Sequence, residues 1–440
     1  MKFRVVAIAA SVILCGANLG AQNSAGVASE VQSVYAGSVT LYEYLHKNPE
    51  LSSRETQTAA KLAGDLKELG YEVTTGVGGT GIVGVLKNGS GPTVMLRTEL
   101  DALPVLENTG LSFASKARVK DDSGNDVPVM HACGHDLHMA SWMATARIMA
   151  GSRNTWKGTL VVIGQPAEET GAGAKAMVND GLLTRFPRPD FAIAIHDDAR
   201  RPSGEVGFRA GPALANADAL TIRIFGRGGH GARPETTIDP VVIAARTVLA
   251  LQTIVSREIS PFDPTVITVG SIHGGTKNNI IPDEVVLQLT VRSFTEPVRQ
   301  HLLTAIDRVV KAEASAAGAQ KLPTIERIPT AEALVNDSAL TRRVSAALVR
   351  ALGPSRAVEA AQEMVGEDFS VFQLAGIPTL QLRVGAVEPA KFAAAVKSGT
   401  TLPSLHSAQF APDLEPTMKT AIMAQVISLR ELMPAGGARR

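Results

Sequence analysis

The feature that most constrains the fold is an alternation of short apolar runs and helical segments, interrupted once in the middle of the chain. This alternation is typical of an α/β layer with a largely parallel sheet. In such sheets functional side chains gather at the carboxyl ends of the strands. We expect strands over Ile82–Leu86, Thr93–Leu100, Leu160–Gln165, Phe191–His196 and Thr379–Val384, and helices over Val27–Lys47, Arg54–Leu69, Met139–Ala150, Ala172–Leu183, Ser338–Leu352 and Pro416–Leu432.

The interruption begins near Gly211 and has an element order of its own. Strand, helix, strand, strand, helix and strand follow one another, which is the βαββαβ order of the ferredoxin-like unit. We therefore expect a main domain in two parts, 22–212 and 329–440, with a smaller domain inserted at 213–328. The inserted elements are predicted at Ala219–Phe225, Pro240–Ile259, Thr265–Ile272, Glu284–Phe294, Val298–Ala317 and Thr324–Ile328.

The N-terminus has the pattern of a secretory signal peptide at residues 1–21. Lys2 and Arg4 precede the apolar run Val5–Leu14, and small residues follow. The run is too short to span a bilayer, and no later stretch approaches the length that a membrane span requires. We expect a secreted or periplasmic protein with no membrane partner once the signal is removed. A buried N-terminal helix is one alternative, and lipidation at Cys15 is another, although the bulky Leu14 disfavours lipidation.

Composition excludes several classes of protein. Lys and Arg number 43 against 42 Asp and Glu, and aromatic residues make up 4% of the chain. Such a balance gives no support for nucleic-acid binding. With only two cysteines, Cys15 and Cys133, a disulfide scaffold is excluded as well.

Metal-binding residue types concentrate in the segment His131–His138, which contains three histidines, one cysteine and one aspartate. Cys133 and His135 are two residues apart, so on an extended segment their side chains point the same way. A thiolate and imidazoles suit zinc or another first-row transition metal. The alternative is a buried cysteine surrounded by hydrogen-bonded histidines.

Four further residues are candidates for the same centre. Glu168 and Glu169 follow a predicted buried strand, and on extended backbone one could bind metal while the other acts as a general base. His196 ends another apolar run, and His406 lies in a loop near the C-terminus. Taken singly, the glutamates also fit an exposed acidic strand end, and His196 fits a packed core residue.

The inserted domain carries three polar candidates. His230 lies in a Gly-rich loop, which lacks the Lys-Ser/Thr ending of a phosphate-binding loop. Asn279 lies in a second polar segment, and Arg292 lies in a predicted strand. Bidentate binding of a carboxylate is one use for Arg292, and a surface salt bridge is the alternative.

These segments together resemble the dinuclear metallopeptidase family of aminoacylases and carboxypeptidase G. They are most similar to its amidohydrolase branch, which includes hippurate hydrolases and indole-acetyl-amino-acid hydrolases. Each segment alone is weak evidence, whereas the ordered set is highly specific and runs through nearly all of the mature chain. The segments are Leu45–Leu51, Asp101–Pro104, His131–Asp136, Gln165–Glu169, Gly228–His230, Asn279–Asp283, Glu367–Ser370 and Leu405–Ser407.

The resemblance implies a mixed-sheet α/β metallopeptidase catalytic domain whose insertion is a ferredoxin-like lid and dimerisation domain. It implies a homodimer, two divalent metal ions (Zn, Mn, Co or Ni) and hydrolysis of N-acyl amino acids by metal-activated water. The implied metal ligands are Cys133, which bridges, His135, Glu169, His196 and His406. Glu168 is the implied general base, Asp101 orients the ligands, His230 stabilises the oxyanion, and Asn279 and Arg292 bind the substrate carboxylate.

One position departs from the branch, which usually has Asp-Met-Asp where this chain has Glu99-Leu100-Asp101. Glu99 keeps the charge but is one methylene longer, which affects the choice or affinity of the metal. Two rival functions stay open. One is a secreted dipeptidase or aminopeptidase on the same scaffold, and the other is an inactive binding relative.

Overall fold

The computed structural model describes the backbone of residues 5–436 and the side chains of residues 25–436. The chain divides into two compact units. Unit 1 consists of Met1–Gly211, Asn336–Ala361 and Val371–Arg440, and unit 2 consists of Pro212–Val335 and Gln362–Ser370. Of the predicted signal peptide, Lys2 and Arg4 lie outside the described residues, and Cys15 lies where only the backbone is described.

Unit 1 is built on an eight-stranded mixed sheet with the strand order β1-β2-β6-β3-β7-β18-β8-β17. The centre is parallel, because β3 pairs with β6 and β7, and β7 pairs with β18. The predicted α/β architecture is therefore confirmed. The strands are β1 (Glu72–Val77), β2 (Gly81–Asn88), β3 (Thr93–Glu99), β6 (Gly158–Gln165), β7 (Phe191–Pro202), β8 (Val206–Phe208), β17 (Ala357–Glu359) and β18 (Thr379–Val387), and a short pair is β4 (Arg118–Lys120) with β5 (Asp126–Pro128). A further short pair, β9 (Gly211–Leu214) with β16 (Leu334–Asn336), belongs mostly to unit 2.

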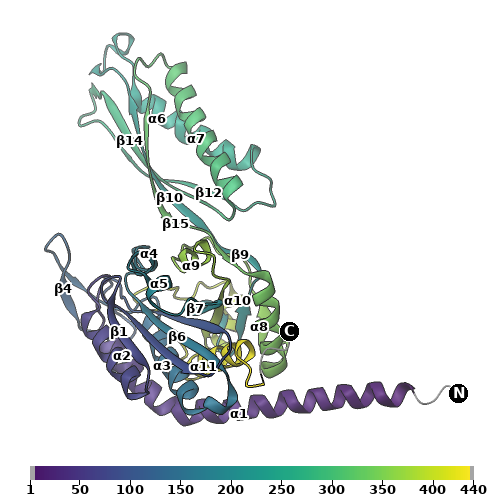
Figure 1. Ribbon diagram of the computed structural model, residues 1–440. Helices are drawn as coiled ribbons and strands as arrows, with labels where there is room; N and C mark the ends of the chain where they lie inside the picture. Colours follow the sequence, from purple (N-terminus) through teal and green to yellow (C-terminus); the bar gives the residue numbers. More distant parts are fainter. Residues whose placement is uncertain (1–4, 437–440) are drawn as a thin grey trace. The chain divides into compact units, whose positions relative to one another are not determined.

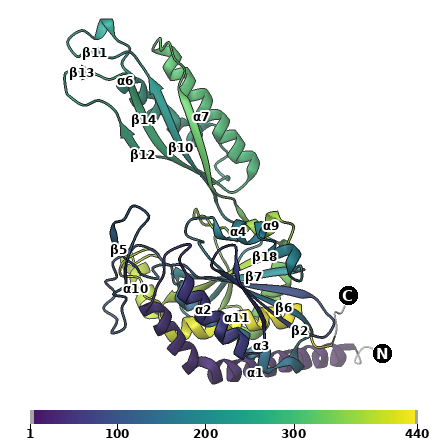
Figure 2. The ribbon, with the colours of Figure 1, turned by 60° about the vertical axis from the view of Figure 1, so that its left-hand side comes forward.

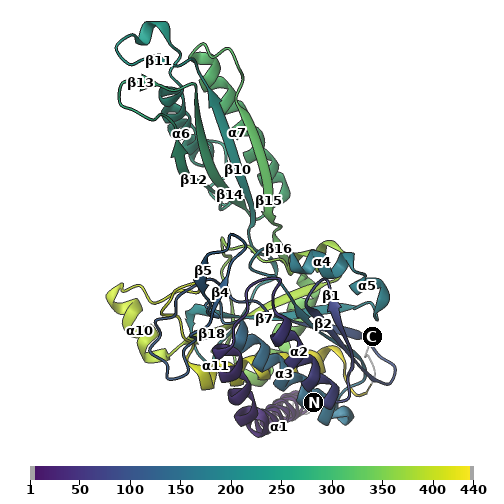
Figure 3. The ribbon, with the colours of Figure 1, turned by 90° about the vertical axis from the view of Figure 1, so that its left-hand side faces the viewer.

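Helices pack in layers beside this sheet (Figures 1 and 3). α3 (His135–Gly151) is buried almost throughout and contacts β3, α1 and α11, so it forms the centre of the unit 1 core. α1 runs from Val5 to Lys47, so the helix that the sequence predicts from Val27 is continuous with the N-terminal apolar run. The remaining helices are α2 (Thr56–Glu68), α4 (Gly173–Asn179), α5 (Leu182–Arg185), α8 (Ser338–Leu352), α9 (Ser370–Leu374), α10 (Pro389–Ser398) and α11 (Leu414–Leu432).

Unit 2 has the βαββαβ order that the sequence predicts. Its four strands follow the order β12-β14-β10-β15, and all three neighbouring pairs are antiparallel. α6 and α7 pack against the sheet and against each other (Figure 2). The elements are β10 (Asn216–Phe225), β11 (Gly229–His230), α6 (Pro240–Arg257), β12 (Val266–His273), β13 (Ile280–Ile281), β14 (Glu284–Ser293), α7 (Glu296–Ala316) and β15 (Thr324–Ala331).

Among the described residues, α6 alone is long and apolar enough to cross a membrane. One face of α6, including Ile243, Leu251 and Ile254, is packed in the core of unit 2. A core helix of a domain accounts for the same composition.

One local prediction is wrong. The helix expected over Ala172–Leu183 is split into α4 and α5, because Gly181 adopts a left-handed φ of 86° between them. The end of the inserted unit also differs from 328, since β15 continues to Ala331 and the contiguous unit reaches Val335. Unit 2 further includes 362–370, which the element pattern does not indicate.

Candidate metal centre

The parallel strands of unit 1 bring the candidate residues to one edge of the sheet. β3 pairs with β6 up to Glu99 and Gln165, and the chain then continues to Asp101 and to Glu169, respectively. His196 lies in β7, just beyond the point where β3 stops pairing with it at Ala194. The carboxyl ends of neighbouring parallel strands are the usual place for a functional site.

Cys133 and His135 reach the centre through a turn, which corrects the expectation of an extended segment. His135 is the first residue of α3, and Gly134 before it has a left-handed φ of 75°. A Cβ at Gly134 would also collide with the Asp197 carboxylate, so this position requires glycine for two reasons. The two side chains still converge, but backbone reversal rather than strand alternation brings them together.

The tautomer of His135 is set by the backbone. Its Nδ1 lies 2.8 Å from the Asp101 carbonyl oxygen, so Nδ1–H donates and Nε2 is the nitrogen left to bind a metal. Nε2 is buried and has no hydrogen-bond partner among the described residues. Such an imidazole, held at one nitrogen and directed into the site by the other, is arranged as a metal ligand.

Cys133 lies between two histidines. Its Sγ is 3.6 Å from Nε2 of His196 and 3.2 Å from Nε2 of His406. Burial raises the pKa of the Cys133 thiol well above its ordinary value, and the charge of Glu169 raises it further. A nearby cation would reverse this balance, because metal ligation favours the thiolate.

Glu168 and Glu169 do not alternate on extended backbone, as the sequence suggests. Ala167 has a left-handed φ of 50°, and the Gly171 N–H donates to the Glu168 carbonyl to close a turn. Both carboxylates consequently lie close to His135, and the ligand atoms of these three residues are all within 4.8 Å of one another. The turn places the two acids on the same side of the site.

Glu55 anchors this turn, although nothing in its sequence context indicates that role. The fully buried Glu55 accepts a 2.8 Å hydrogen bond from the Ala167 N–H and another from the Thr80 hydroxyl. Burial raises the pKa of Glu55, and these hydrogen bonds lower it, with a net increase. Its only signal in the sequence is an acidic residue at the start of α2, which reads as an ordinary helix terminus.

His406 joins the centre from a loop. Its backbone has a φ of 65°, which is costly for a residue with a side chain, and its N–H donates to the Ala132 carbonyl at 2.8 Å. Nε2 lies 3.4 Å from Oε1 of Glu169. Strained backbone of this kind is common where a side chain is held for function.

Several groups of three candidate ligands lie close together among the described residues, and two of these groups share Cys133. The first ligand group is Cys133, His135 and His196, and the second ligand group is Cys133, Glu169 and His406. In each group the ligand atoms lie within 4.8 Å of one another. Oε1 of Glu169, like Nε2 of His135, is buried without a hydrogen-bond partner among the described residues. Thiolate, imidazole and carboxylate donors suit a pair of first-row divalent cations, so the residues fit the implied metals.

Asp101 lies behind these ligands. Its Oδ2 accepts hydrogen bonds from the Ser52 hydroxyl at 2.7 Å and from the Glu169 N–H at 3.0 Å, and its Oδ1 is 3.4 Å from Nδ1 of His135. Burial alone would raise the pKa of Asp101, but its hydrogen bonds and the nearby His135 lower it below the ordinary value. An ionised Asp101 can therefore orient one ligand of each group.

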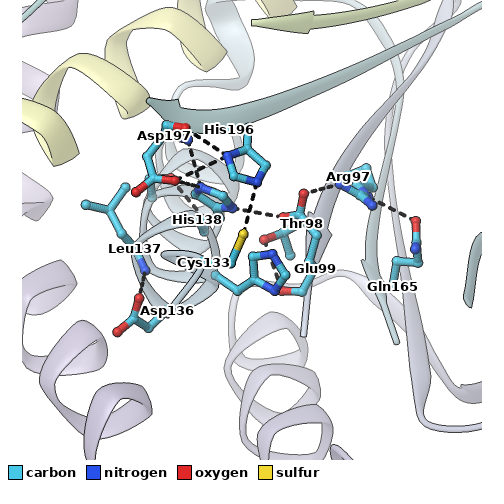
Figure 4. Close-up of polar contacts among 12 residues, drawn as sticks. Arg97, Thr98, Glu99, Cys133, Asp136, Leu137, His138, Gln165, His196 and Asp197 are labelled. Atoms are coloured by element: carbon cyan, nitrogen blue, oxygen red, sulfur yellow. Dashed lines mark hydrogen bonds and ion pairs between the residues drawn. The ribbon is translucent and has the colours of Figure 1, made fainter. Parts of the chain in front are cut away.

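A second buried network runs beside the first ligand group (Figure 4). Arg97 bonds to Glu99 and, through Nε, to Oε1 of Gln165 at 3.0 Å. Glu99 Oε2 is 3.1 Å from Nδ1 of His138, whose Nε2 is 3.2 Å from Oδ1 of Asp197. Burial would lower the pKa of His138, but Glu99 and Asp197 raise it. The sequence analysis assigns no role to Asp197, which follows His196 directly.

The three candidates in the inserted domain lie in unit 2. His230 and Asn279 are neighbours, because β11 pairs with β13 and the Gly231 N–H donates to the Asn279 carbonyl at 2.9 Å. Arg292 donates to the Met364 carbonyl at 2.6 Å.

The length of β14 separates His230 and Asn279 from Arg292. This strand runs from Glu284, beside β13, to Arg292, near its other end, a span of roughly 26 Å at 3.3 Å per residue. Within one copy of the chain, Asn279 and Arg292 therefore lie too far apart to bind the same carboxylate together.

Known proteins resemble this chain over most of its length. Thermostable carboxypeptidase 1 of Saccharolobus solfataricus is 35% identical over 91% of this chain and 96% of its own. The Arabidopsis thaliana IAA-amino acid hydrolase ILR1-like 2 is 36% identical over 77% of this chain and 74% of its own. Hippurate hydrolase of Campylobacter jejuni is 40% identical over 62% of this chain and 68% of its own.

A solved structure and a family model agree with these relatives. The Bacillus subtilis YXEP protein, described as a dinuclear metal binding peptidase from the M20 family, superimposes with a TM-score of 0.75. It is 28% identical over 91% of this chain and 99% of its own. The model of peptidase family M20/M25/M40 matches residues 95–406. The chain belongs to peptidase family M20/M25/M40, whose members are hydrolases that act on amide bonds.

Proposed function

We propose that this protein is a metal-dependent amidohydrolase that cleaves the amide bond of N-acyl amino acids. The observation that carries the proposal is the pair of ligand groups sharing Cys133, with Glu168 beside them. The names of the relatives support the substrate class, since two are hydrolases of amino-acid conjugates, hippurate and indoleacetyl amino acids. A pair of bound divalent cations supplies polarisation of the amide carbonyl and lowers the pKa of water.

Glu168 is the proposed general base. It lies in one group with His135 and Glu169, but it belongs to neither ligand group, so its carboxylate can take the proton from the attacking water. It then returns the proton to the leaving amine. Asp101 keeps Nδ1–H of His135 and the Glu169 backbone in place while the proton moves.

The substrate screen tests this function directly. Purified enzyme loaded with zinc, manganese, cobalt or nickel is assayed on N-acetyl, N-benzoyl and N-indoleacetyl amino acids and on free-amine dipeptides. The proposal expects turnover of the acylated substrates that is abolished by a chelator. Faster turnover of the dipeptides would favour the rival peptidase, and metal binding with no turnover of any substrate would favour the inactive binding relative.

A matched pair of variants tests the roles of the two glutamates. Glu168→Gln should lower kcat by roughly 10²–10⁴, the usual contribution of a general base, with the metal content unchanged. Glu169→Gln removes a ligand instead and should lower the metal content. Retained turnover in Glu168→Gln, or a full metal complement in Glu169→Gln, contradicts the assignment.

We infer that unit 2 works as a lid in a homodimer, in which His230 and Asn279 act on the centre of a second copy. The separation of this pair from Arg292 along β14 supports the inference, because two copies allow both sets of groups to reach one substrate. In this arrangement His230 stabilises the oxyanion, while Asn279 and Arg292 bind the carboxylate.

Complementation of two inactive variants tests the dimer. Glu168→Gln and His230→Ala chains, refolded together, should regain about a quarter of wild-type activity, because half of the dimers then contain one intact site of two. Each variant refolded alone is the control. A mixture no more active than its parents, or a chain that sediments as a monomer, would contradict the proposal.

We further propose that residues 1–21 are a secretory signal and that the mature enzyme is secreted or periplasmic. The support is the basic start and the apolar run Val5–Leu14. Expression with and without residues 1–21, followed by cell fractionation, tests this. Identical distribution of the two forms would refute the proposal.

A further inference from the structure

The network beside the first ligand group ends on a metal ligand. Nδ1 of His196 lies 2.8 Å from the Asp197 carbonyl oxygen and 3.2 Å from the Asp197 carboxylate. With Nδ1–H donating to these oxygens, Nε2 of His196 is directed at Cys133 Sγ. Asp197 thus fixes both the tautomer and the rotation of a ligand ring.

The Asp197 side chain is itself held from two directions. Oδ1 lies 3.2 Å from Nε2 of His138, a residue of the first turn of α3, and the Asp197 N–H donates to that same nitrogen at 2.9 Å. On its other side the carboxylate packs directly against Gly134, which lies between the ligands Cys133 and His135. The carboxylate therefore touches the segments that carry all three members of the first ligand group.

Glu99 supports His138 from the sheet. Glu99 and Arg97 are two residues apart on β3, so their side chains share one face of the sheet. One carboxylate oxygen of Glu99 pairs with Arg97, and the other lies 3.1 Å from Nδ1 of His138. All of these side chains are buried in unit 1 (Figure 4).

Stability is a poor explanation for burying so many charges. Burying an ion pair costs desolvation energy, and well-packed apolar residues of similar volume often stabilise a fold as well or better. A chain of hydrogen-bonded charges that ends at a ligand has a more specific use, since partners behind a ligand set its orientation and basicity.

The second ligand group is held by different contacts. Asp101 binds the Glu169 N–H, Glu55 binds the turn before it, and the His406 backbone bonds to Ala132. The network of Glu99, His138 and Asp197 consequently supports the first ligand group more than the second.

We propose that Glu99, His138 and Asp197 are positioning residues that set the affinity of the first ligand group for its cation, largely independently of the second. This inference rests on the proposed dinuclear centre. It also assigns a use to Glu99, the residue that departs from the amidohydrolase branch, because its length allows it to contact both Arg97 and His138.

Metal release from Asp197→Ala tests the inference. Full-length protein is loaded with Co²⁺ or Zn²⁺ and titrated with a chelator, and bound metal per chain is counted at each step. In Asp197→Ala one equivalent should leave at a chelator concentration 10–100-fold lower than in the wild type, the range typical of lost partners behind ligands. The other equivalent should leave where it leaves in the wild type.

Two further variants separate positioning from general damage. Asp197→Asn keeps the shape and an acceptor oxygen, so it should restore most of the lost affinity. Ser141→Ala removes different buried hydrogen bonds on α3, since its hydroxyl donates to the His138 carbonyl and accepts from Nε2 of Gln425, and it should release both metals as the wild type does. Should Asp197→Ala fail to fold, Glu99→Gln is measured in its place, with the same loss expected at one equivalent.

The outcomes divide cleanly. The inference is overturned if the positioning variants release both metals as the wild type does. It is also overturned if their affinity for both metals falls equally and Ser141→Ala shows the same fall. The proposed function is judged separately by wild-type turnover of N-acyl amino acids. If one metal leaves the variants earlier than the other but the wild type hydrolyses no N-acyl amino acid, only the proposed function is refuted. If the wild type hydrolyses these substrates but the variants do not release one metal selectively, only the inference is refuted.

Discussion

The two ligand groups share Cys133 but are held in different ways. The first ligand group lies on the turn that precedes α3, at the first residue of α3 and on β7, and its members are all buried. The second depends on loops, since Glu169 follows the turn at Ala167 and His406 has 55% of its side chain exposed. The fold thus preforms one half of the centre, whereas the other half relies on segments that can move more easily.

The largest effect is expected at the shared ligand. Cys133→Ala removes a donor from both groups, so we expect loss of both cations and a fall in turnover of at least about three orders of magnitude, since metal stabilisation is worth several kcal/mol. Metal analysis and assay of the same sample check this. The isosteric Cys133→Ser is the control for size, and retention of two cations by Cys133→Ala would end the bridging assignment.

The next pair of variants separates the groups. His196→Ala and His406→Ala should each lose one cation, but only the first should lower the free energy of unfolding clearly, because His196 is buried and hydrogen-bonded. We expect a loss of about 1–3 kcal/mol for His196→Ala and within about 0.5 kcal/mol for the exposed His406→Ala. Denaturant unfolding of the metal-free proteins measures both. Equal losses of unfolding free energy in the two variants would contradict the proposed difference between the two ligand groups.

A substitution at Gly134 tests how firmly the first ligand group is held. Gly134→Ala meets a left-handed φ of 75° and the Asp197 carboxylate, and we expect a loss of roughly 2–4 kcal/mol in the free energy of unfolding. Gly124→Ala is the matched control, since Gly124 has a φ of 82° and no heavy atom near its missing Cβ. Its loss should be only about 1–2 kcal/mol. Similar losses in the two variants would mean that Asp197 does not crowd Gly134.

The last prediction concerns the pH dependence of stability at His46, which contacts Asp136 on α3. His46 on α1 lies 2.6 Å from Asp136 and 3.0 Å from Glu107. Burial alone would lower the pKa of His46, but these two carboxylates raise it to about 10. A raised pKa means that protonated His46 stabilises the fold fully below its unfolded value near 6.5, and that this stabilisation is lost as pH rises toward 10.

His46→Gln checks that sign. The difference in free energy of unfolding between wild type and variant should be largest near pH 6 and shrink steadily toward pH 10. Lys47→Gln, the exposed neighbour on α1, should show no such trend. A difference that grows with pH would reverse the assignment of charge to His46.

Much of the fold is predictable because its signals are local. α8 has the predicted bounds Ser338–Leu352, since its apolar periodicity and the Asp337 cap lie within one segment. β1 escapes prediction because it is an edge strand with a partly exposed face and a glycine at its irregular end. α10 escapes it as well, because it is largely exposed and buries only Ala395.

The residues of the metal centre also differ in how well the sequence predicts them. Its ligand types are recognisable because cysteine and histidines cluster within a short segment. Asp197 and Glu55 are missed because their partners are far away in sequence, at His138 and Ala167 respectively. The turn at Glu168 and Glu169 is missed for a related reason, since the left-handed Ala167 is held by the distant Glu55.

Stepwise removal of metal while turnover is monitored tests whether two cations held by the groups that share Cys133 carry the hydrolysis. Wild-type enzyme that hydrolyses an N-acyl amino acid is titrated with a chelator, and metal per chain and rate are recorded together. We expect two cations per chain, which leave in separable steps, and we expect turnover to be lost when the first cation leaves. Undiminished turnover after both cations are gone would contradict this expectation.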